Sequence, residues 1–325
     1  MVAFTHPAMY TSPLMQRAAN GRQGLLALLF TTLAVANLGC DVVGSRGRDA
    51  SAPLSQRVSE VSVRIDAPPT GTPSVSVLAF RASVTGLLAG DVLGVVDPLV
   101  ARAPEKGCEI RDVAAAARAL PDQGGQVELE ELTSVSLFLG AGMPALRPTP
   151  RVYPQLAAAV GGVIGEAGPV DLAALPEKIT VILAGQESDG PVGLTLQQVP
   201  RLLDQAGESL ANVKHLDPTV DLALTVSGPA RSFLEIRPLF GASTAIACPA
   251  GPNGRVVVPH ALLEQVAASS GRVPVTFEAV WRDNRDALLG GQTVRLSIET
   301  RSAAVLDLRP AGSEQKPQSP PPSAQ

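Results

Sequence analysis

The chain has 325 residues, with 26 lysines and arginines, 30 acidic residues and a formal net charge of −4. Its basic residues form no block, which excludes the electrostatic footprint of a nucleic-acid-binding protein. Aromatic residues make up only 3% of the chain, so we expect no surface that stacks sugars or bases on aromatic rings. The 30 glycines and 29 prolines favour turns and short strands over long helices.

The amino-terminal segment has the composition of an export signal. Arg17 and Arg22 precede an apolar run over residues 24–38, and no acidic residue occurs before Cys40. This run is short for a bilayer-spanning helix, which needs about 20 residues. It is typical of the apolar region of a cleaved signal peptide.

The end of this run, Asn37-Leu38-Gly39-Cys40, resembles the lipobox of bacterial lipoproteins, in which a small residue directly precedes a cysteine. The resemblance implies that residues 1–39 are a signal peptide and that the thiol of Cys40 receives a diacylglyceryl group. An ordinary secretory signal and an uncleaved anchor are the alternatives.

Cysteine usage agrees with export. If Cys40 carries the lipid, Cys108 and Cys248 remain as an even pair, which can form a disulfide in an oxidising compartment. No spacing rule connects two cysteines so distant in sequence. A bridge and two separately buried thiols are therefore both open.

After a flexible tether over residues 40–57, the period of hydrophobicity changes to two. Val61, Val63 and Ile65 alternate with polar residues, which predicts a half-buried strand. Similar short strands follow, and we predict an irregular β domain over residues 58–197. Its glycine-rich residues 161–168 lack the lysine and hydroxyl residues of a phosphate-binding loop, so we interpret them as a flexible turn.

Residues 198–217 are the predicted linker between two halves of the body. Their helix propensity favours a short helix, although Pro200 and Pro218 bracket the segment.

The strand pattern is clearest over residues 218–308. Val294, Leu296 and Ile298 alternate with polar residues, and a turn is predicted at residues 283–286. About seven short strands at this spacing predict an immunoglobulin-like β-sandwich. Residues 309–325 have almost nothing to bury, and we expect them to be disordered.

No constellation of residues indicates catalysis. His215 and His260 are isolated, and no zinc-binding spacing of histidines or cysteines occurs, so we expect no metal and no cofactor. Trp281 belongs to the inward face of a predicted strand and is interpreted as core. Glu128 and Glu130 share one face of another strand and are interpreted as solvated surface.

A second, looser resemblance covers residues 219–308, with a fainter similarity over residues 108–139, and is carried by the sequence IACPAGPNGRVVVPHALLEQV, residues 246–266. This segment is similar to one in uncharacterised lipoproteins of GC-rich Gram-negative bacteria, which pair an isolated cysteine, a polar turn, a short strand and a helix. The resemblance implies an exported, all-β protein and adds nothing about chemistry.

The sequence therefore predicts a mainly β protein with two β-sandwich-like domains, the second immunoglobulin-like, and a few short helices. We expect an exported, non-enzymatic structural or protein-interaction module of the cell envelope. Its partners would be the membrane, through the lipid on Cys40, and other envelope proteins, with no nucleic acid. The alternative is an envelope small-molecule-binding protein or an enzyme whose site is built from loops, because fold does not fix function.

Overall fold

The computed structural model describes residues 55–309, except for 98–99, 101, 113–114, 133–134, 141–142, 154–158, 184–190, 240–243, 271–273 and 290. One compact unit contains all of these residues. The predicted signal peptide, Cys40 and most of the predicted tether lie outside the described residues, as does the predicted tail beyond Arg309.

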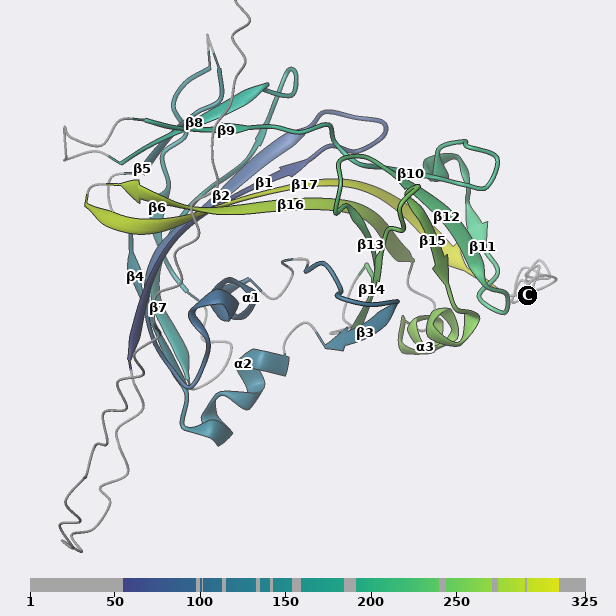
Figure 1. The fold of residues 1–325 in the computed structure, drawn as a ribbon, viewed down its shortest axis with the longest axis horizontal. Helices are drawn as coiled ribbons and strands as arrows, with labels where there is room; N and C mark the ends of the chain where they lie inside the picture. The colour runs from purple at the N-terminus through teal and green to yellow at the C-terminus, as the bar shows by residue number, and fades with distance from the viewer. Residues whose placement is uncertain are drawn as a thin grey trace, which may run out of the picture. The chain divides into compact units, whose positions relative to one another are not determined.

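The described chain is mainly β, as predicted, and is built on one large mixed sheet of 11 strands (Figure 1). Strand β11 (His215–Leu216) pairs with β17 beside the main path. The strands on the main path, in order across the sheet, are β3 (Glu109–Asp112), β14 (Thr244–Pro249), β13 (Phe233–Pro238), β16 (Val275–Leu289), β17 (Gln292–Leu308), β1 (Gln56–Asp66), β2 (Ser74–Thr85), β4 (Gln126–Glu131), β7 (Val160–Asp171) and β6 (Thr149–Val152).

Strands from both predicted domains lie in this one sheet. The join is the parallel pairing of β1 with β17, which runs in register from Glu60 opposite Arg295 to Asp66 opposite Arg301. On its other side β17 forms a long antiparallel hairpin with β16. The large sheet therefore contains strands from both sides of the predicted linker, residues 198–217. The immunoglobulin-like arrangement of residues 218–308 stays a prediction.

Two small sheets pack on one face of the large sheet and close separate apolar cores. Strands β5 (Val135–Phe138), β8 (Lys178–Leu183) and β9 (Val192–Thr195) cover a core that includes Val61, Val63, Leu296 and Ile298. Strands β10 (Arg201–Leu203), β12 (Leu222–Ser227) and β15 (Arg255–Val258) cover a second core. The helix α3 (His260–Ser270) contributes Leu263 and Val266 to that second core.

The opposite face carries short helices over its β2–β4–β7 part. The side chains of β2 divide by parity, because Val75, Val77 and Ala79 face the first core while Phe80 and Ala82 face a third one. This third core is closed by α1 (Val92–Val96) and α2 (Ala115–Ala119). Figure 1 shows both helices on the other side of the sheet from β5, β8 and β9.

Three local predictions were wrong. Residues 198–217 contain β10, a 3-10 helix (Leu210–Asn212) and β11 in place of the expected helix, because Leu202 and Leu210 are buried in the second core. Residues 161–168 lie within β7 and are not a turn. Residues 283–286 lie within β16, which continues to Leu289 as part of the hairpin with β17.

Candidate functional site

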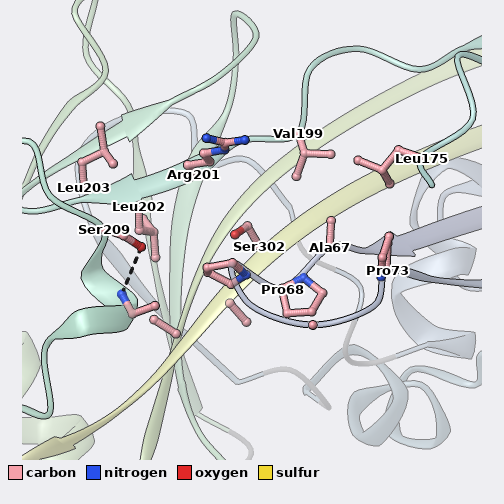
Figure 2. Close-up of a pocket in the computed structure, with 15 residues that line it drawn as sticks. Ala67, Pro68, Pro73, Leu175, Val199, Arg201, Leu202, Leu203, Ser209 and Ser302 are labelled. Atoms are coloured by element: carbon pink, nitrogen blue, oxygen red, sulfur yellow. Dashed lines mark hydrogen bonds between the residues drawn. The ribbon is translucent and has the colours of Figure 1, made fainter. Parts of the chain in front are cut away.

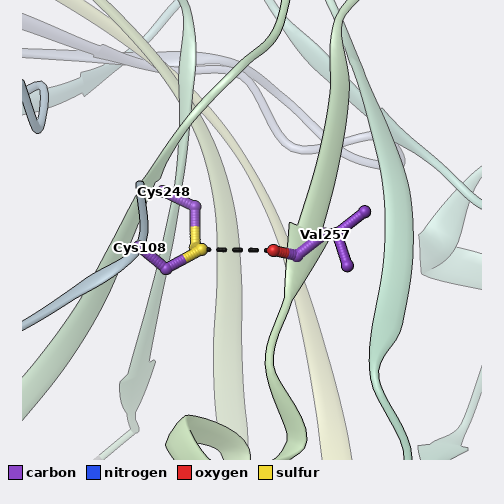
Figure 3. Close-up of a disulfide and its surroundings, with 3 residues drawn as sticks. All are labelled: Cys108, Cys248 and Val257. Carbon is purple, nitrogen blue, oxygen red and sulfur yellow. Dashed lines mark hydrogen bonds between the residues drawn. A yellow bond between two sulfur atoms is a disulfide. The ribbon is translucent and has the colours of Figure 1, made fainter. Parts of the chain in front are cut away.

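Two of the three cysteines are joined in the structure. Cys108 and Cys248 form a disulfide with an S–S distance of 2.06 Å (Figure 3). The Sγ of Cys108 lies 3.3 Å from the carbonyl oxygen of Val257. Because a disulfide sulfur carries no proton, this is a close contact and not a hydrogen bond. The bond fastens the chain before β3 to β14, and Cys248 belongs to the second core.

The residues discussed for catalysis or metal binding are not brought together. His260 begins α3, where its backbone N–H and its Nδ1 each lie 2.8 Å from Oδ1 of Asp221. These contacts hold the pKa of Asp221 below its ordinary value. Asp221 therefore caps the amino terminus of α3, although it lies 39 residues before His260 in the sequence. Trp281 is buried in the first core, and Glu128 and Glu130 are exposed.

The polar side chains of the central strands form a buried charged surface that the sequence analysis missed. It lies on the face of β1, β17, β16 and β13 opposite the two small sheets, and we call it the ionic face. Its members share that side of the sheet by register, and they are Glu60, Arg64, Glu235, Arg237, Glu278, Arg282, Ser297, Glu299 and Arg301.

Arg301 is the centre of the ionic face, and its side chain is 3% exposed. It donates from Nε to Oε1 of Glu299 at 2.5 Å and from Nη1 to Oε2 of Glu278 at 2.8 Å. Glu278 also accepts from Nη2 of Arg237 at 2.7 Å. Arg64 joins the same group by pairing with Glu299 and with Asp97, which follows α1. The arrangement is continuous across four strands.

The carboxylates of the ionic face are incompletely paired. In the described residues Glu60, Glu235 and Glu299 each keep one buried oxygen, Oε2, without a hydrogen-bond partner. Burial raises the pKa of Glu235 to about 7, against the opposing effect of Arg301 and Arg237. Burial also raises the pKa of Glu60, whereas Arg301, Arg64 and Arg282 overcome burial and hold the pKa of Glu299 below its ordinary value.

A cavity of about 380 Å³ lies on the opposite side of the same sheet, and we call it the inter-sheet cavity (Figure 2). Three stretches distant in sequence line it, together with Leu175: residues 67–73 of the β1–β2 loop, residues 199–211 around β10, and residues 302–304 of β17. Most of its wall is apolar, formed by proline, alanine, leucine and valine side chains.

Few of the residues that line the inter-sheet cavity have polar side chains. They are Arg201, Ser209 and Ser302. Ser302 is 3% exposed, and Ser209 accepts a hydrogen bond from the backbone N–H of Ala211 at 3.4 Å. In Figure 2 Arg201 lies across the cavity from Pro68 and Ala67. Among the described residues no carboxylate forms an ion pair with Arg201, in contrast to the arginines of the ionic face.

Within the described ranges, no group of three or more His, Cys, Asp or Glu side chains is arranged to hold a metal ion. None of the helices in the described part of the chain combines the length and apolarity needed to cross a bilayer.

Comparison with known protein families, with curated proteins and with solved structures finds no match.

Proposed function

We propose that the chain is an exported lipoprotein, held at a membrane surface of the cell envelope by a lipid on Cys40. Its β body would act as a non-enzymatic structural or protein-interaction module. The predicted tether over residues 40–57 would separate this body from the membrane.

The observation that carries the proposal is the disulfide between Cys108 and Cys248. Structural disulfides persist in oxidising compartments and are rare in the cytosol, so the bond supports export. It also accounts for two of the three cysteines in the chain. The remaining one is Cys40, directly after the apolar run and Gly39, where the lipobox resemblance calls for a free thiol.

The buried pairing of the charged side chains on the ionic face favours a non-enzymatic body. Arg301 is buried and donates hydrogen bonds to the buried carboxylates of Glu278 and Glu299. A group that is paired in this way and shielded from solvent is poorly placed to touch a substrate. The second candidate function, binding of a small molecule, is favoured by the inter-sheet cavity.

The test is the intact mass of the protein extracted from its native membrane, measured with and without a reductant. We expect the mass of residues 40–325 plus a diacylglyceryl group, with an additional acyl chain where the amino terminus is also acylated. Reduction of the disulfide should add two hydrogen atoms to the mass. An unmodified amino terminus and free thiols at Cys108 and Cys248 would overturn the proposal.

Matched variants separate the anchor from the disulfide. Replacing residues 1–40 by an ordinary cleavable secretory signal should move the protein from the membrane fraction to the soluble fraction. The double variant Cys108→Ala/Cys248→Ala should stay in the membrane fraction. If the protein without Cys40 and its apolar run remains in the membrane fraction, the lipid is not the anchor.

A further inference from the structure

The inter-sheet cavity has the dimensions and the lining of a small-molecule site. Ligand pockets usually measure about 300–1,000 Å³ and are apolar, with a few placed polar groups. The cavity measures about 380 Å³ and combines an apolar wall with one arginine and two serine hydroxyls. Its wall is assembled from the large sheet, the β1–β2 loop and the β10 region.

Charge defines one end of a matching ligand. Arg201 lines the cavity without an ion pair among the described residues, whereas Arg237 and Arg301 on the other side of the sheet are paired with glutamates. A guanidinium presents a planar fork of donors that fits a carboxylate. Arg201 is exposed, so an anion can reach it from solvent.

Shape and polarity define the rest of the ligand. Leu175, Val199, Leu202 and Pro68 offer apolar contacts beside Arg201 (Figure 2). Taking about 30 Å³ for each water-sized group, the cavity holds about a dozen non-hydrogen atoms. This size suits a small acid and is too small for a folded partner or a long peptide.

A buried polar group next to the floor is also left without a partner. Thr300 is fully buried in β17, and its Oγ1 has no hydrogen-bond partner in the described structure. Because side chains two residues apart share a face of a strand, Thr300 lies on the same side of β17 as Ser302, which lines the cavity. Ser302 lines the cavity, whereas Thr300 is not among the lining residues.

We propose that the inter-sheet cavity binds a small monocarboxylic acid with an apolar chain, its carboxylate on Arg201 and its chain against Leu175, Val199 and Leu202. This inference does not depend on the lipid anchor.

The probe is decanoate, which has 12 non-hydrogen atoms, titrated calorimetrically below its micelle-forming concentration in the absence of detergent. The protein is residues 41–325, which contain the whole compact unit and neither Cys40 nor the apolar run, so that no attached lipid or detergent competes for the cavity and the result is independent of acylation. Decanol, with the same chain and no charge, is titrated in parallel.

We expect one decanoate per chain, and Arg201→Gln should raise its Kd about tenfold or more because a charge-assisted contact is lost. Arg255→Gln is the matched control, since Arg255 is exposed on β15 of the same small sheet and does not line the cavity. It should leave the Kd unchanged. Arg201→Gln should also leave the Kd of decanol unchanged.

A second variant tests the location. Ala211 is exposed and lines the cavity, so Ala211→Trp should fill it and abolish binding of both probes without disturbing the core. The proposal is overturned if the parent protein shows no saturable decanoate binding, or if Arg201→Gln and Arg255→Gln bind decanoate equally. Because Arg201 is a surface residue, its variant keeps the test decisive even if Ala211→Trp fails to fold.

Discussion

The two faces of strand β17 are both buried, but one carries apolar side chains and the other carries charged and polar ones. Val294, Leu296 and Ile298 pack into an apolar core under a small sheet. Their alternate neighbours Ser297 and Glu299 are only 1% and 2% exposed and belong to the ionic face. The apolar face is therefore stabilised by removal of apolar surface from water, whereas the charged side chains of the ionic face are paired by ion pairs and hydrogen bonds in a region shielded from water.

The difference shows how each face responds to change. An apolar core tolerates substitutions that keep volume and hydrophobicity. A buried ionic group depends on every partner, because removal of one charge leaves the others uncompensated. We therefore expect the ionic face to be the more sensitive to single substitutions and to pH.

The largest expected effect comes from removing the central arginine. Arg301→Met leaves Glu299 and Glu278 buried without their main partner, which should lower the free energy of unfolding by about 3–5 kcal/mol. Denaturant unfolding measures the loss. Arg309→Met is the control, because the pair of Arg309 with Asp307 is largely exposed and should contribute less than about 1 kcal/mol. Equal losses in the two variants would contradict the contrast between the faces.

The disulfide should have the next largest effect. Its Cys248 belongs to the second apolar core, and its Cys108 lies just before β3. Cys108 also follows Asp97, which pairs with Arg64 of the ionic face. The double variant Cys108→Ala/Cys248→Ala should lose about 2–4 kcal/mol of stability. A reductant should destabilise the parent protein by a similar amount and leave the double variant unchanged. Insensitivity of the parent protein would indicate that this bond does not stabilise the body.

The ionic face should make stability depend on pH. The pKa of Glu235 is raised to about 7 in the folded protein from an ordinary value of 4.5, so between these values the folded state binds more protons than the unfolded state. Stability should therefore fall as pH rises from about 4.5 to about 7, by on the order of 1–3 kcal/mol from this group. The raised pKa of Glu60 acts in the same direction, and the lowered pKa of Glu299 acts against it.

The variant Glu235→Gln isolates this contribution, because a glutamine does not titrate. Thermal unfolding of the parent and the variant across this pH range should give a flatter curve for the variant. Parallel curves would mean that Glu235 does not titrate as its surroundings predict.

The smallest effect concerns the helical cover beside the ionic face. The buried Tyr153 donates a hydrogen bond of 2.5 Å from its hydroxyl to the carbonyl oxygen of Val96 at the end of α1, and burial raises the pKa of Tyr153 to about 12. Tyr153→Phe should lower the free energy of unfolding by about 1 kcal/mol. Hydrogen exchange should locate the loss in α1 and leave the second core unchanged; an equal loss in both would contradict a local role.

The sequence predicted the apolar side of the strands better than the polar side. The alternation of Val61, Val63 and Ile65 correctly placed a strand and its inward face. The same alternation suggests that the polar partners face water, yet Glu60 is 1% exposed. A period of two gives which residues share a face, and it does not give what covers that face.

The candidate sites depend on contacts between distant segments. The disulfide joins residues 140 positions apart, and no local pattern selects that pair. The inter-sheet cavity combines residues 67–73, 199–211 and 302–304, so no single motif encodes it. The stretch after Val199 was expected to be a helix by propensity, but burial of Leu202 and Leu210 overrides that preference.

The parallel pairing of β1 with β17 has a consequence for how the protein is made. Arg64 and its partner Glu299 are 235 positions apart in the sequence. Strand β1, the first described strand, therefore cannot form this pairing until β17, the last one, is present. Such non-local pairing slows folding and leaves a strand edge open in the meantime. Until β17 has been synthesised, the β2–β4–β7 and β13–β14–β16 parts are not joined through the sheet. Strand β17 is therefore the strand through which the two parts become one sheet.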